Sequence, residues 1–158
     1  MNPLNSPLEV GMRALVLLTS TFPEPLDLAE LVYLDHVMLH SGELNGPPSL
    51  HPTLPAGPGE LAMRRHLIEQ GLRVLMRAGL ADVEAGEEGL LYRASEEGPG
   101  FVDLLEAPYV ADLRDRAAWV IAAHSSSELD VRAVTRAITD RWVRDFDSQL
   151  PHSGSDHA

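Results

Sequence analysis

The chain has no cysteine and no lysine among its 158 residues, and aromatic residues make up only 5%. The absence of cysteine excludes disulfides, thiolate metal sites and a cysteine nucleophile. With so few aromatic residues, we expect a core built mainly from leucine, valine and alanine. No apolar run reaches the roughly 18 residues that a membrane span requires. The first nine residues also lack the basic region of a signal peptide, so we expect a cytoplasmic protein with no membrane contact.

What the chain does have is a large excess of acid, with 24 acidic residues against 12 basic ones and a net charge of −12. Every basic residue is arginine. Of the four segments 1–59, 60–79, 80–106 and 107–158, only residues 60–79 carry a net positive charge, whereas residues 80–106 contain eight acidic residues and one arginine. Apolar residues make up 44% of the chain, which is enough for a packed core and excludes wholesale disorder.

Helical patterns, with apolar residues three and four positions apart, occur in five segments. A capping serine at Ser6 and a capping box from Asp27 to Glu30 indicate where the first two helices begin. Between the second and third helices lies a proline-rich loop. The predicted helices cover residues 7–21, 28–40, 60–78, 109–123 and 128–147.

The segment after the third helix is typical of a β-hairpin. Gly79 is suited to end that helix, and the residues 86–89 (Gly-Glu-Glu-Gly) separate two short apolar segments, 80–85 and 90–94. Three helices followed by a two-stranded ribbon predict a mainly α (α+β) chain with a winged helix-turn-helix core, one short β-hairpin and C-terminal helices. We expect a winged-helix-like domain over 1–106 with its proline-rich loop at 41–59, a C-terminal helical extension over 107–150, and a disordered tail at 151–158.

The third predicted helix carries the candidate contact residues for a partner or a nucleic acid. They are Arg64, Arg65, Arg73 and Arg77. In a winged helix this element contacts DNA bases, and the alternative is a solvated helix face or a protein-binding surface. The predicted wing carries acidic residues that would oppose a polyanion, so we expect weak or indirect DNA contact and favour a protein partner. A stand-alone winged-helix DNA-binding regulator is the alternative function.

The last predicted helix has one apolar stripe that we interpret as a docking element. Its members recur at three- and four-residue steps: Val131, Val134, Ile138, Trp142 and Phe146. A helix with such a stripe must pack against something. The sequence leaves open whether that is the body of its own chain, a second copy or a partner subunit.

Three histidines offer a different hypothesis, a small metal-dependent enzyme. His36 and His40 are one helical turn apart, a spacing that can share a metal ion, and His51 follows in the loop. No H-E-x-x-H motif accompanies them, and the alternative is that His40 and His51 hydrogen-bond to loop carbonyls. The sequence also lacks a G-x-S-x-G nucleophile motif and a phosphate-binding loop. We therefore predict no metal site, no cofactor, no catalytic residues and no enzymatic activity.

Several short motifs over residues 2–121 resemble the middle component of bacterial ABC-three-component systems. They are Asn2-Pro3, residues 8–13, residues 33–36 through His40-Ser41-Gly42, residues 46–52, Gly59-Glu60-Leu61, Arg64-Arg65, residues 92–96, residues 101–105, Pro108-Tyr109 and residues 116–120.

This resemblance implies a winged-helix adaptor without catalytic activity of its own. In such systems the middle component is encoded beside a coiled-coil ABC ATPase similar to SMC and RecN proteins, and beside an effector. The systems are similar to Lamassu-type defence against phages and plasmids. The resemblance therefore implies two protein partners, the SMC-like ATPase and the effector, for a cytoplasmic adaptor subunit.

Overall fold

The computed structural model describes residues 6–51 and 60–125. In chain order the elements are α1 (Pro7–Thr21), β1 (Leu26–Asp27), α2 (Leu28–Leu39), the 3₁₀ turn η2 (Ser41–Leu44), α3 (Glu60–Arg77), β2 (Ala81–Gly86), β3 (Gly89–Ala94), α4 (Gly98–Asp103) and α5 (Pro108–Ser125). Helices predominate and a small antiparallel sheet accompanies them, which confirms the predicted α+β class.

The two predicted caps fix the starts of α1 and α2. The Ser6 hydroxyl accepts a hydrogen bond from the Glu9 amide at 3.2 Å, and Pro7 occupies the first turn. The Asp27 carboxylate accepts from the Glu30 amide at 2.7 Å, and the Glu30 side chain accepts from the Asp27 amide at 3.2 Å. These bonds satisfy amides that a helix start leaves without a partner inside the helix.

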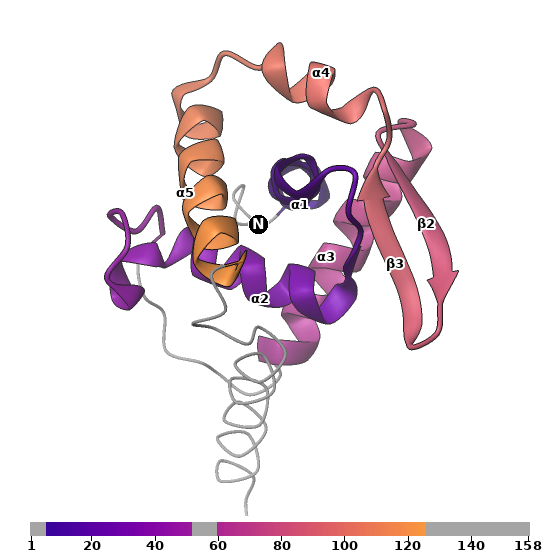
Figure 1. Cartoon of the computed structure of the whole chain (residues 1–158), viewed down its shortest axis with the longest axis horizontal. Coiled ribbons are helices and arrows are strands. Elements are labelled where there is room, and N and C mark those ends of the chain that lie inside the picture. The colour runs from indigo at the N-terminus through magenta and orange to yellow at the C-terminus, as the bar shows by residue number, and fades with distance from the viewer. Residues whose placement is uncertain (1–5, 52–59, 126–158) are drawn as a thin grey trace, which may run out of the picture.

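Helix α1 is the centre of the body, and α2, α3, α4 and α5 surround it (Figure 1). Its residues from Val10 to Leu18 are almost all buried. Helix α1 crosses α3 at two glycines, where a Cβ on Gly71 would lie 2.7 Å from the backbone nitrogen of Gly11. Only two residues without side chains allow this approach, so the α1–α3 packing depends on both glycines.

The sheet has three strands in the order β1-β3-β2, all antiparallel. Strands β2 and β3 form the predicted hairpin, with Gly86 paired to Gly89 across the turn. Gly79 has a φ of +74° and ends α3 as predicted. The element order α1-β1-α2-α3-β2-β3 agrees with the order on which we based the winged helix-turn-helix assignment, and that assignment itself stays a prediction.

Three elements differ from the sequence-based expectation. Strand β1 adds a third strand, because Leu26 and Asp27 pair with Tyr92 and Leu91 of β3. The first part of the expected loop at 41–59 forms the turn η2, and α4 follows the hairpin where we predicted no helix. Each element is too short to show an apolar period.

Other predicted features lie outside the described residues. These are the second part of the proline-rich loop at 52–59, the helix at 128–147 with its stripe of Val131, Val134, Ile138, Trp142 and Phe146, and the tail at 151–158.

Candidate functional site

The predicted arginine set divides into two parts. Arg65, Arg73 and Arg77 are exposed on α3. Arg64 is half-buried, and it lies close enough to α2 for its charge to act on the α2 histidines. The structure therefore offers three of the four arginines to solvent and turns the fourth toward the body.

His36 on α2 and His40 at its C-terminal cap lie beside Arg64, with their ring planes tilted by 45°. Their ring centroids are 4.8 Å apart. Burial, and then the charge of Arg64, lowers the pKa of His36 to about 4, and the same two causes lower the pKa of His40. Both rings are therefore neutral at neutral pH. Within residues 6–51 and 60–125, no group of three or more histidine and carboxylate side chains is arranged to hold a metal ion.

The third histidine of the metal hypothesis, His51, contacts α5. Its Nε2 atom is 2.8 Å from the Tyr109 hydroxyl. The Nε2 atom of His51 therefore bonds to a side chain of α5, and the expected bond from His51 to a loop carbonyl stays a prediction. His40 does reach loop backbone, forming a hydrogen bond with the main chain of His51.

A buried ion pair connects α1 to α2 next to these residues. Arg13 Nε donates to Asp35 Oδ1 at 2.8 Å and Arg13 Nη2 donates to Asp35 Oδ2 at 3.2 Å. The two side chains are only 3% and 5% exposed. Burial lowers the pKa of Arg13 and Asp35 raises it, and the net shift is upward. Arg13 also interacts with Tyr109, so polar side chains run from the buried Asp35 and Arg13 to the half-buried Tyr109 and His51.

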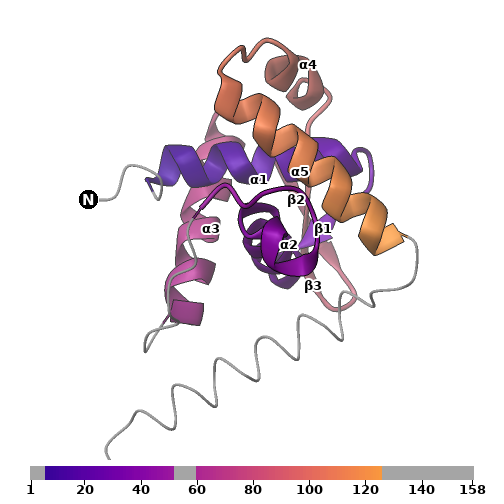
Figure 2. The same cartoon turned by 90° about the vertical axis from the view of Figure 1, so that its left-hand side faces the viewer.

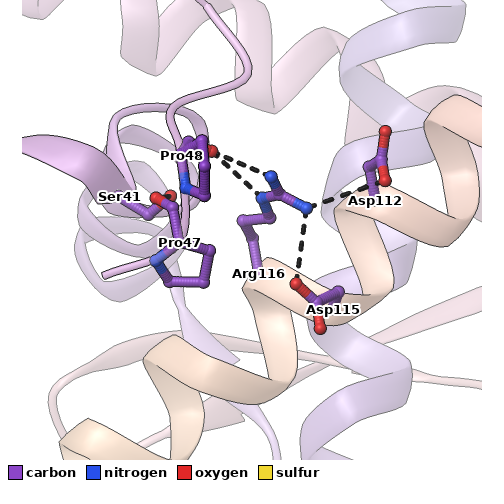
Figure 3. A network of polar contacts seen from close by, with 6 residues as sticks. All are labelled: Ser41, Pro47, Pro48, Asp112, Asp115 and Arg116. Atoms are coloured by element: carbon purple, nitrogen blue, oxygen red, sulfur yellow. Dashed lines mark hydrogen bonds and ion pairs between the residues drawn. The ribbon is translucent and has the colours of Figure 1, made fainter.

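A second set of contacts fixes the loop after α2 against α5 (Figure 3). Arg116 donates from Nε and Nη2 to the carbonyl oxygen of Pro48 at 3.2 and 2.9 Å. Its Nη1 atom lies 3.3 Å from Asp115 and 3.7 Å from Asp112. The Ser41 hydroxyl donates to the Pro47 carbonyl at 2.8 Å. The two prolines therefore present carbonyls at fixed positions, and α5 binds one of them.

Trp119 completes this junction by packing on the loop backbone. A Cβ on Gly46 would lie 2.5 Å from the Trp119 ring, so the ring sits directly on the glycine. We call this set of contacts between the loop 40–51 and α5 the loop–α5 junction. Many motifs of the predicted resemblance meet here, including Gly46-Pro47-Pro48, Pro108-Tyr109 and Arg116 through Trp119.

An apolar groove of about 510 Å³ lies where α1, α3 and α4 meet. Its walls come from α1 (Leu8, Met12, Leu15), from the end of α3 and the residues after it (Val74, Leu75, Ala78, Leu80), and from α4 with the residues on either side of it (Glu97, Phe101, Leu104). Leu104 is 79% exposed and Leu8 is 67% exposed. Sequence reasoning did not find this groove, because it depends on α4 and on how three helices converge.

The hairpin presents the acidic surface that the sequence predicted. Asp82, Glu84, Glu87 and Glu88 are all exposed on it, and Glu84 forms an ion pair with Arg93 across the strands. Exposed carboxylates of this kind repel phosphate groups.

Comparison with known proteins decides the family. Residues 3–145 match the family model described as ABC-three component (ABC-3C) system Middle Component 2. The chain belongs to this family. No curated protein and no solved structure matches it. As a middle component it is one subunit of a multi-subunit system and has partner subunits. Among the described residues no helix is both long and apolar enough to cross a lipid bilayer.

Proposed function

We propose that this middle component is a non-catalytic adaptor that bridges an SMC-like ABC ATPase and an effector subunit. The proposed complex is a cytoplasmic prokaryotic defence system of the Lamassu type, directed against phages or plasmids. The observation that carries the proposal is the family match over residues 3–145, which includes every described element.

The surface charge supports a protein partner over duplex DNA. Arg65, Arg73 and Arg77 provide an exposed basic face on α3, but the neighbouring hairpin exposes four carboxylates. A continuous phosphate backbone would meet both surfaces, whereas an acidic patch of a partner protein can contact α3 alone. We assign the α3 arginines to partner contact on this ground.

The loop–α5 junction supports the adaptor role in a different way. It ties the loop after α2 to α5 through Arg116, Trp119 and the Tyr109–His51 bond. Surfaces on the two sides of the junction are held in one orientation. A rigid body of this kind positions two partners relative to each other, which is what a bridging subunit must do.

Purification from a host that carries the complete system tests the proposal. A tagged ATPase should retain the effector when this chain is present and lose it when the gene for this chain is deleted. Arg65→Ala combined with Arg73→Ala should weaken the binding of one partner at least about tenfold. Arg114→Ala is the matched control, because Arg114 is an exposed arginine on α5. An effector that co-purifies equally without this chain would refute the bridging role.

A further inference from the structure

The apolar groove between α1, α3 and α4 has no role in the proposed function. We propose that the chain's own C-terminal segment occupies it, with Trp142 and Phe146 of the apolar stripe inserted beside Leu104. The C-terminal stripe is then an internal element that completes the body.

The length of chain after α5 allows this arrangement. Helix α5 starts near α4, and its other end lies beside α2, away from α4 (Figures 1 and 2). Its 18 residues rise about 27 Å at 1.5 Å per residue. If the residues after Ser125 form a helix antiparallel to α5, that helix covers the same distance in about 18 residues, which corresponds to Trp142 and Phe146. These two residues therefore return to the level of α4 and the groove.

The chemistry of the two surfaces is complementary. The groove exposes apolar side chains that are costly to leave in water, with Leu104 79% and Leu8 67% exposed. The stripe holds one of the two tryptophans of the chain, and the other, Trp119, is already packed on Gly46. A buried tryptophan in such a groove contributes more apolar contact than any other side chain in the stripe.

Cysteine cross-linking tests the proposal cleanly, because the chain contains no cysteine. Leu104→Cys is combined with Asp145→Cys, which lies three residues after Trp142 and on the same helix face. The matched control combines Leu104→Cys with Asp140→Cys, which replaces the same residue type on the opposite face. Both variants are first shown to have the melting temperature of the unmodified full chain, and a short bismaleimide is then added.

We expect the Asp145 pair to cross-link within one chain at least about tenfold faster than the Asp140 pair. Equal rates for the two pairs would overturn the proposal. A product of twice the chain mass would also overturn it, in favour of a second copy in the groove. Hydrogen exchange on the unmodified chain gives a second measurement. Protection of at least about a hundredfold is expected over residues 131–146, and free exchange there would contradict the proposal.

Discussion

The ion pair between Arg13 and Asp35 makes the sharpest prediction about stability. Its two hydrogen bonds of 2.8 and 3.2 Å lie between side chains that are 3% and 5% exposed. Asp35→Asn keeps the volume of the side chain and removes its charge, so Arg13 becomes a buried cation without its counter-ion. Removing one partner of a buried pair costs about 3–5 kcal/mol. We expect the lower end, about 3 kcal/mol, because the asparagine oxygen still accepts one hydrogen bond.

Urea unfolding followed by circular dichroism measures this loss, and the melting temperature should fall by about 10 °C or more. Asp103→Asn is the matched control. It removes the same charge from an exposed pair with Arg114, whose side chains are 49% and 63% exposed, and should cost less than about 0.5 kcal/mol. Arg13→Met combined with Asp35→Leu should recover most of the lost stability, because no buried charge remains. A loss below about 1 kcal/mol for Asp35→Asn would refute the reasoning.

The remaining predictions concern the junction, the histidines and DNA. Gly46→Ala should lower the free energy of unfolding by about 1–3 kcal/mol, because its Cβ would overlap the Trp119 ring. Gly100→Ala is the control and should not lower it, because a Cβ there meets nothing within 4 Å. Equal losses for the two variants in urea titrations would contradict this prediction. His36 has a pKa of about 4 in the folded state against an ordinary value of 6.5, so the unfolded state binds more protons between these values. The free energy of unfolding should therefore fall by up to about 3 kcal/mol as the pH drops from 6.5 to 4. His36→Gln should make the free energy of unfolding less dependent on pH, whereas His66→Gln at an exposed position should not. The chain alone should bind short duplex DNA weakly and with strong salt dependence, and a sequence-specific nanomolar complex at physiological salt would overturn the charge argument.

Local signals in the sequence predicted much of the fold. Ser6, the Asp27–Glu30 box and Gly79 each act through neighbours within a few residues, and each lies where the prediction placed it. The hairpin was predicted from Gly86 and Gly89 for the same reason. Strand β1 and helix α4 were missed, because two and six residues contain no measurable period.

The contacts that build the candidate site join residues that are far apart in the sequence. Arg13 and Asp35 are 22 positions apart, His51 and Tyr109 are 58 apart, and Arg116 and Pro48 are 68 apart. No local pattern encodes such pairs, since each depends on how separate helices pack. For the same reason, the sequence grouped Arg64 with the exposed arginines, although packing of α3 on α2 brings it to His36 and His40.

The bridging claim is tested most directly with three purified subunits. The SMC-like ATPase is immobilised, the effector is passed over it, and binding is recorded by interferometry while this chain is added in increasing amounts. The account predicts that effector binding is at least about tenfold tighter at saturating amounts of this chain than in its absence, and that it rises in proportion to the amount of chain bound. An effector that binds the ATPase with the same affinity whether or not this chain is present would contradict the account.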